Sequence, residues 1–207
     1  MCNTVVVVGR PPKFTEDQIL DTASRLVACQ GPAATSVAAI AAELGAPTGS
    51  IYHRFASRDL LMGKLWIRVV RDAQAGFIHS LEQRGPSSTL DAALHLPRWS
   101  REHLHEAQVA AMYRREDLAG EWPDELGADL DTLNHGLRQA LRRHTKYLFG
   151  YVRRSDVERV TFALIDVPHA ATRRHLLAAE RPPRNIDRLV AEVVTCLLPA
   201  RSRTAPS

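Results

Sequence analysis

The stretch Thr48–Arg54, "TGSIYHR", concentrates side chains that bind anions and base edges. Its hydroxyls, imidazole and guanidinium can all form hydrogen bonds with phosphates or with bases in a DNA groove. On a helix, the residues at positions i, i+1, i+4 and i+5 share a face. That face is polar or small and carries Thr48, Gly49, Tyr52 and His53, with Ser50 beside them. The opposite face carries Ile51 and Phe55, which are expected to point inward.

The elements around this stretch predict a helix-turn-helix. Thr35 or Ser36 is suited to cap a preceding helix, and Gly45 supplies a left-handed stop after it. Pro47 is suited to the first turn of the next helix. The inner face of the preceding helix carries Val37, Ile40, Ala41 and Leu44. Two helices joined by a short turn with glycine place the second helix in the major groove.

A long helix is predicted to begin after Ser57, because apolar residues repeat every fourth position from Leu61 to Leu81. The positive charge of Arg58 near the start of this helix interacts unfavourably with the helix dipole unless an anion is present. A first helix is predicted earlier in the chain, and its inner face carries Ile19, Ala23, Leu26 and Val27. Further helices are predicted near 88–104, 105–119, 124–149, 155–180 and 184–198. Breaks are expected at Pro97, Trp122-Pro123, Gly150 and residues 181–183, and a kink or interruption at Pro168.

Composition is that of a globular protein: 45% of the 207 residues are hydrophobic and 24% are charged. No run is long enough for a membrane span or a signal segment, so we expect a cytoplasmic protein with no membrane partner. Positive charge is concentrated in two segments: residues 1–13 have a net charge of +2 and residues 53–71 of +4. The segment between them, residues 14–52, has a net charge of −3. Cys29 and Cys196 are expected to be small buried side chains.

The stretch from Phe14 to Trp66 resembles the DNA-binding domain of the tetracycline-repressor-like (TetR) family of bacterial regulators. The resemblance is carried by Ile40-Ala41, Leu44-Gly45, Gly49, Tyr52, Phe55 and Arg58-Asp59-Leu60-Leu61. It implies an all-α fold, with an N-terminal three-helix helix-turn-helix domain joined by a long helix to a C-terminal helical domain for ligand binding and dimerisation. The expected units are an arm (1–13), the DNA-binding domain (14–57), the effector and dimerisation domain (58–199) and a tail (200–207).

The resemblance implies DNA contacts at specific positions. Thr35 or Ser36 would bond a phosphate; Thr48, Gly49 and Ser50 would approach bases; Tyr52 and His53 would reach the backbone; and Arg58 would bind phosphate. Arg54 adds a possible contact and departs from the family pattern, as does Pro47. The arm carries Arg10 and Lys13 on a Pro-Pro segment, and either enters the minor groove or is a disordered tail.

The resemblance also implies a pocket for a small effector, with Trp66, Phe77, Trp99, Met112 and Tyr113 as candidate lining. The last two helices carry apolar stripes that either bury in the chain's own core or form a homodimer. The candidate dimer residues are Val157, Val160, Leu164, Ile186, Leu189, Val190, Val193, Val194 and Leu197. A symmetric dimer enlarges the footprint on DNA, and its operator is expected to be a near-palindrome.

Catalysis and metal binding have little support in the sequence. No two histidines have the i,i+3 or i,i+4 spacing of helical metal ligands, and no phosphate loop or nucleophile elbow appears. We therefore expect no cofactor, no metal and no enzymatic activity. The hypothesis is a dimeric repressor that a small molecule releases from double-stranded DNA. The alternative is an all-helical enzyme or metal-binding protein that keeps a vestigial helix-turn-helix.

Overall fold

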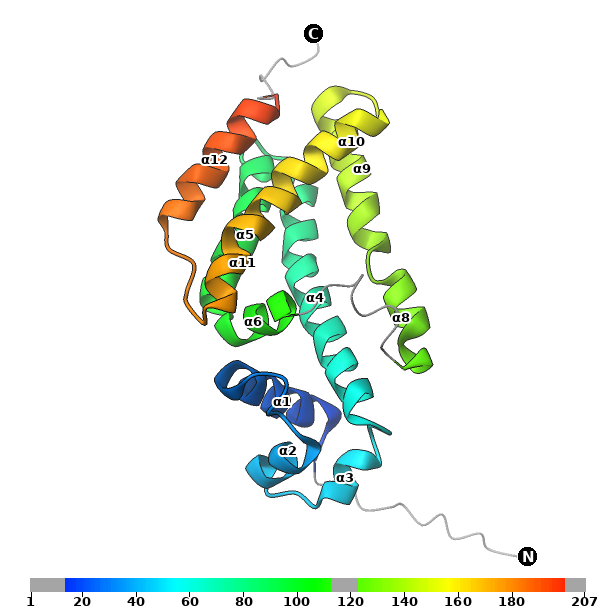
Figure 1. Ribbon diagram of the computed structural model, residues 1–207. Helices are drawn as coiled ribbons and strands as arrows, with labels where there is room; N and C mark the ends of the chain where they lie inside the picture. The colour runs from blue at the N-terminus through cyan, green and yellow to red at the C-terminus, as the bar shows by residue number, and fades with distance from the viewer. Residues whose placement is uncertain (1–13, 113–122, 200–207) are drawn as a thin grey trace, which may run out of the picture.

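The computed structural model describes residues 14–112 and 123–199, and every regular element among them is helical (Figure 1). Three helices form a small unit at one end, which we call the head: α1 (Glu16–Gln30), α2 (Val37–Leu44) and α3 (Thr48–Tyr52). The long helix α4 (Arg58–Glu82) leaves the head and runs into the larger unit, which we call the body. The predicted all-α fold, with a helix-turn-helix head and a helical body, is confirmed.

The body packs most of its remaining helices along α4 (Figure 1). The remaining helices are α5 (Ser88–Glu102), α6 (Leu104–Met112), the 3₁₀ turn η1 (Asp124–Leu126), α8 (Gly127–Thr132), α9 (His135–Phe149), α10 (Arg154–Thr161), the π-turn η2 (Phe162–Asp166), α11 (Val167–Leu177) and α12 (Asn185–Leu197). Helix α6 contacts α1 on one side and α4, α5 and α11 on the other. It is therefore the element of the body that lies against the head.

Side-chain caps start the helices of the head. The Thr15 hydroxyl accepts from the Gln18 N–H while the Gln18 amide oxygen accepts from the Thr15 N–H, a reciprocal capping box. The Ser36 hydroxyl caps α2 at the Ala39 N–H, and the Ser57 hydroxyl caps α4 at the Leu60 N–H. Each cap satisfies an N–H that the helix itself leaves without a partner.

The turn between α2 and α3 depends on Gly45. This residue has φ 61° and ψ 33°, a left-handed conformation that glycine adopts without steric cost. Its N–H donates to the Ala42 carbonyl at 3.2 Å, and the Ala46 N–H donates to the Ala41 carbonyl at 2.9 Å. This closes α2 with a Schellman arrangement and turns the chain directly into α3.

The head and the near end of the body share one apolar core. Its fully buried side chains from the head include Ile19, Val27, Ile40, Ile51 and Phe55, and those from α4 include Leu61 and Leu65. Trp99, three α6 residues (Ala107, Val109 and Ala111) and Leu176 of α11 belong to the same cluster. The predicted stripe of α4 is buried except at Ala73, which is half-buried, so the sequence period correctly located the inner face of that helix.

Pro168 interrupts the predicted helix over 155–180, as expected. Helix α10 ends at Thr161, a π-turn follows, and the Val167 N–H reaches back five residues to the Phe162 carbonyl. Because proline has no N–H, the carbonyl four residues before it loses its helical donor, and the wider turn accommodates this.

Three other expectations were wrong. The helix over 124–149 is broken at residues 133–134, where Asn134 accepts a hydrogen bond from Gln74 of α4 at 2.8 Å. Pro97 does not break α5, because the packing of that helix against α4 and α12 outweighs the local cost of a proline. Cys29 and Cys196 are exposed, since each lies two positions after a buried valine and therefore on the outer face.

None of the described helices is long and apolar enough to span a membrane.

Candidate nucleic-acid interface and ligand cavity

Helix α3 turns its polar residues outward. Thr48, Gly49, Tyr52 and His53 are exposed and Ser50 is half-buried. Ile51 and Phe55 are buried at 0% and 1% exposure, which fixes the rotation of the short helix about its axis. Tyr52 keeps half of its surface in solvent although its ring is large and apolar. The surface predicted from the spacing of residues 48–53 therefore exists, and it faces away from the rest of the protein.

Gly49 has a property that the fold itself does not explain. A Cβ atom added to it would meet no atom within 4 Å, and its φ lies outside the left-handed region. Neither packing nor backbone conformation therefore requires glycine here, and glycine weakens a helix relative to alanine. The glycine leaves the backbone here open to close approach from outside.

Two predicted contact residues are held by the protein's own backbone. The Thr35 side chain is buried and donates to the Gly31 carbonyl at 2.9 Å, so the predicted phosphate contact by this side chain is wrong. Ser36 is exposed, and it is the cap of α2. Arg54 folds back on its own helix and donates to the Ser50 carbonyl at 3.0 Å.

Arg58 joins the start of α4 to the loop before α2. Its Nε donates to the Thr35 carbonyl at 2.8 Å, and one terminal nitrogen donates to the Pro32 carbonyl. The other terminal nitrogen lies 3.5 Å from the Asp59 carboxylate. These carbonyl and carboxylate oxygens offset the unfavourable position of the Arg58 charge at the start of helix α4. The phosphate contact of Arg58 stays a prediction. Arg10 and Lys13 lie outside the described residues.

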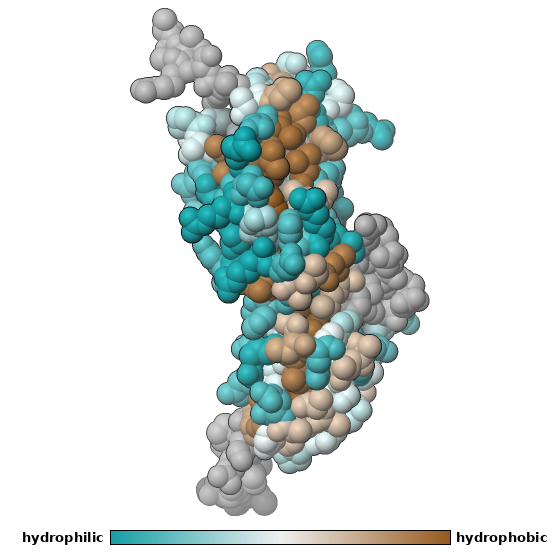
Figure 2. Space-filling view, turned by 60° about the vertical axis from the view of Figure 1, so that its left-hand side comes forward, coloured by the Kyte–Doolittle hydropathy of each residue, from teal (hydrophilic) through white to brown (hydrophobic). Residues whose placement is uncertain are grey.

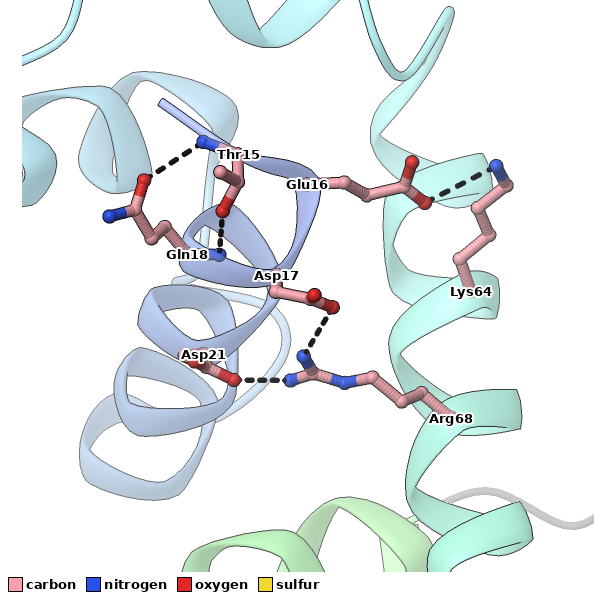
Figure 3. Close-up of polar contacts among 7 residues, drawn as sticks. All are labelled: Thr15, Glu16, Asp17, Gln18, Asp21, Lys64 and Arg68. Atoms are coloured by element: carbon pink, nitrogen blue, oxygen red, sulfur yellow. Dashed lines mark hydrogen bonds and ion pairs between the residues drawn. The ribbon is translucent and has the colours of Figure 1, made fainter. Parts of the chain in front are cut away.

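Ion pairs connect α1 to α4 along the side of the head (Figure 3). Arg68 lies 2.7 Å from Asp21 and 3.4 Å from Asp17, and Lys64 lies 3.4 Å from Glu16. The carboxylates come from the first two turns of α1 and the cations from successive turns of α4. The head is thereby attached to α4 by charge as well as by the shared core.

The body encloses a cavity of about 530 Å³. Its walls come from α4, α5, α6, the segment around α8 and α9, the π-turn and α11. The lining includes Trp66, Phe77, Leu96, Trp99, Ala107, Ala111, Leu137, Leu164 and Leu176. The volume is typical of a site for a drug-sized molecule, and apolar side chains dominate such sites.

Polar groups line the cavity in two distinct zones. Ser100 is fully buried, and Thr172 is buried and bonded to the Pro168 carbonyl. Asp166 and His169 are exposed and Arg173 is half-buried, so the charged groups lie toward the opening.

His95 adds a polar group to the α5 wall. Its Nε2 is 2.9 Å from the Ala73 carbonyl, and burial lowers the pKa of this imidazole below its usual value. The hydrogen bond to Ala73 and the nearby Asp72 oppose the shift. At neutral pH the ring is therefore predominantly uncharged. Because a carbonyl only accepts, Nε2 carries the proton and Nδ1 is an acceptor.

The sequence model for bacterial regulatory proteins of the tetR family matches residues 19–65 of this chain. The match covers most of α1, all of α2 and α3 and the first third of α4, which is the part of the structure that presents the polar face described above. The head of the chain and the start of α4 therefore match the tetR family.

Solved structures of this tetR-family fold cover almost the whole chain. A TetR transcription regulator from Haloarcula marismortui ATCC 43049 has a TM-score of 0.68 at 16% identity, covering 89% of this chain and 98% of its own. The regulator FadR from Bacillus subtilis, solved in complex with stearoyl-CoA, has a TM-score of 0.67 at 13% identity, covering 91% and 100%. A tetR family regulator from Shewanella sp. PV-4 has a TM-score of 0.61 at 19% identity, covering 90% and 98%. At these identities the likeness shows a shared fold. No curated protein matched the chain.

The predicted pocket residues are partly brought together. Trp66, Phe77 and Trp99 all line the cavity. Met112 is not among the lining residues, because it lies at the end of α6. Tyr113 lies outside the described residues.

Most predicted dimer residues belong to the chain's own core. Val160, Leu164, Ile186, Val190 and Val194 are between 0% and 5% exposed, so a second copy cannot touch them directly. The four that remain accessible are Val157, Leu189, Val193 and Leu197. Phe162, which the sequence did not single out, is 51% exposed and follows the last turn of α10. Figure 2 shows hydrophobic side chains gathered on the upper half of the molecule, on the side where α12 comes forward.

Several cavity residues have no sequence signal. Four of them lie on separate turns of the three helices α5, α9 and α11: His95, Ser100, Leu137 and Arg173. Only tertiary packing brings these residues to the same cavity. The π-turn residues Leu164 to Asp166 had an indirect signal in Pro168, which distorts the helix beside them. Within residues 14–112 and 123–199, no three metal-binding side chains form a cluster.

Proposed function

We propose that this tetR-family protein is a transcriptional repressor that binds a near-palindromic operator as a homodimer and leaves it when a small molecule occupies the cavity. The observation that carries the proposal is the outward polar face of α3, with a glycine that the fold does not require. Hydroxyls, a phenol and an imidazole on a protruding helix match the donors and acceptors of the major groove.

The proposed contacts follow from exposure. Thr48, Gly49 and Ser50 at the start of α3 approach base edges, and Tyr52 and His53 reach the DNA backbone. Ser36 at the start of α2 is placed to contact a phosphate beside them. The proposed division of the chain is a DNA-binding unit at 14–57 and an effector and dimerisation unit at 58–199.

Helices α4 and α6 are the proposed route between the cavity and the head. Ala107 and Ala111 of α6 line the cavity, and both belong to the core that the head shares. Trp66 and Phe77 line it from α4, whose first turn is tied by Arg58 to the α1–α2 loop. A ligand that prefers a shifted α4 or α6 would reposition α3. A coupling of roughly 1–3 kcal/mol changes operator affinity about 5–150-fold.

The homodimer is proposed to bury the exposed apolar side chains of α10, the π-turn and α12. Phe162 and Leu189 are about half exposed, which costs free energy in a monomer and is relieved when a second copy covers them. A twofold pair of heads would place two copies of α3 about one turn of DNA apart, roughly 34–36 Å, or a multiple of it.

Two observations support this reading against an enzyme. Among the described residues, Asp166 is the one carboxylate of the cavity lining, and the Ser100 hydroxyl forms no hydrogen bond with a base. Helix α3 lies at the head end of the molecule (Figure 1), and none of its residues lines the cavity, so its polar side chains serve no reaction there.

The experiment is a gel shift with the DNA that flanks the chain's own gene, repeated across a range of salt concentrations. The proposal expects one retarded complex, competition by the same fragment but not by random DNA, and affinity that falls steeply with salt. Equal competition by both DNAs would contradict sequence-specific binding.

The assembly is tested separately by sedimentation. The wild-type protein should be a dimer at micromolar concentration, and Leu189→Glu should yield monomers that have lost specific DNA binding. Arg188→Glu, at the neighbouring exposed position of α12, is the control for added charge. A wild-type monomer that still binds its operator would exclude the dimer proposal.

A further inference from the structure

The cavity holds a buried hydroxyl that has no hydrogen-bond partner in the described structure. The Ser100 side chain lies on α5, its residue is 0% exposed, and its Oγ makes no hydrogen bond to any described residue. A buried polar atom without a partner destabilises a fold, and native proteins keep few of them. Ser100 lines the cavity, so an occupant of that cavity is the partner available to it.

The cavity that Ser100 lines has three large aromatic rings among its aliphatic side chains. Trp99 is its chain neighbour, and its Nε1 donates to Asp72 at 3.3 Å while its ring stacks on His103 at 5.4 Å, so the indole is fixed in place. Trp66 and Phe77 face the same space from α4. Fixed aromatic rings favour a flat aromatic occupant that stacks against them.

Charge within the cavity is confined to its rim. Asp166 and Arg173 have opposite signs and lie toward solvent, so they give the opening no net preference for either sign. Away from the rim, the polar groups of the described lining are the hydroxyls of Ser100 and Thr172, the amides of Gln74 and Asn134 and the neutral imidazole of His95, and none of them carries a charge. A formally charged group placed there would lose its hydration without gaining a counter-charge, which is costly.

We propose that the effector is an uncharged aromatic molecule carrying a hydroxyl or carbonyl, and that Ser100 is the residue that binds this polar group. The inference rests on the proposed function only in treating the cavity as the effector site. Ser100 selects ligands by hydrogen bonding, while the aromatic walls bind the ring system without regard to its substituent.

Three matched probes test the proposal by isothermal titration calorimetry without DNA: biphenyl, 4-phenylphenol and biphenyl-4-carboxylate. Wild-type protein should bind 4-phenylphenol more tightly than biphenyl and should bind the carboxylate most weakly. Ser100→Ala should weaken 4-phenylphenol binding about 3- to 10-fold, the worth of one neutral hydrogen bond, and leave biphenyl unchanged.

Ser24→Ala is the matched control. Ser24 is also buried, and its Oγ also lacks a partner in the described structure, but it lies on α1 in the head and does not line the cavity. Both variants remove an unpaired buried hydroxyl, so both should keep or raise the melting temperature. Only Ser100→Ala should change the affinity for 4-phenylphenol. This combination separates a ligand-binding role from a general effect on packing.

Equal loss of biphenyl and 4-phenylphenol affinity in Ser100→Ala would overturn the proposal, as would tighter binding of the carboxylate or no binding of any probe. A gel shift with 4-phenylphenol then tests regulation independently. Ser100-dependent binding with unchanged operator affinity would contradict the proposed release mechanism and leave the ligand class standing. If an aliphatic anion released the DNA without dependence on Ser100, the proposed ligand class would be contradicted and the release mechanism would stand.

Discussion

The head and the body of this protein build their candidate binding surfaces in opposite ways. The head presents Thr48, Gly49, Tyr52 and His53, which are close together in the chain and exposed on one short helix and its C-cap. The body builds its cavity from residues between Trp66 and Leu176 on elements that meet only through tertiary packing. A surface of the first kind needs only the turn before the helix and the orientation of the helix about its axis. A cavity of the second kind changes whenever any of its walls moves, and this sensitivity suits it to control the head.

Acidification should distinguish the two regions most strongly. His144 of α9 is 2% exposed and packs on α5, with its Nε2 3.0 Å from the Thr89 hydroxyl. Burial lowers the pKa of His144 from 6.5 to about 4, and a backbone contact at Leu81 only partly offsets this. Between these values the unfolded chain binds a proton that the folded body does not. The free energy of unfolding should therefore fall by up to about 3 kcal/mol as pH drops from 6.5 to 4.

Urea unfolding followed by tryptophan fluorescence measures this effect, since Trp66 and Trp99 both lie in the body. His144→Gln should remove this pH dependence, while His53→Gln on the exposed face of α3 should retain it. Equal acid sensitivity of wild type and His144→Gln would show that the buried imidazole is not the cause.

Replacing Arg58 should act on the head mainly through the lost hydrogen bonds and less through the lost charge. Arg58→Met removes the donors to the Thr35 and Pro32 carbonyls and should cost about 1–2 kcal/mol of stability. Operator affinity should fall because the α1–α2 loop loosens, with the salt dependence of binding unchanged. Arg54→Met, which removes a single bond within α3, is the control. An unchanged melting temperature with a salt slope reduced by about one would instead identify Arg58 as a phosphate contact.

The ion pairs between α1 and α4 should give the smallest effect on stability. Arg68 is partly exposed and its partners Asp17 and Asp21 are mostly exposed, so Arg68→Met should cost less than about 1 kcal/mol. The difference from wild type should vanish at high salt. Arg188→Met, which removes an exposed pair within α12, gives the baseline for a pair that does not join the two regions. A salt-independent loss larger than the baseline would mean that Arg68 acts through packing.

The same contrast explains what the sequence predicted and what it did not. Ser36, Gly45, Ser57 and the buried pair Ile51 and Phe55 are local signals, and each correctly placed an element or a face of the head. Three cavity residues, Trp66, Phe77 and Trp99, were named for their size. Ser100 and His95 were not named, because their roles arise from neighbours distant in sequence.

The wrong predictions have the same origin. Val190 and Val194 have the spacing of an interface stripe, yet the body's own core buries them. A helical period identifies an inner face without identifying what covers it. Thr35 carries a hydroxyl suited to phosphate, yet this hydroxyl is buried and donates to the Gly31 carbonyl of the same chain.

The central claim, that the outward face of α3 binds DNA, is tested most directly by adding side chains to Gly49. A Cβ there meets no atom within 4 Å, so Gly49→Ala and Gly49→Leu should both fold and keep or raise the melting temperature. Their operator affinities, measured by fluorescence anisotropy with the flanking DNA, should fall stepwise, by about tenfold for Ala and about a hundredfold or more for Leu. Wild-type affinity in a correctly folded Gly49→Leu protein would contradict the account.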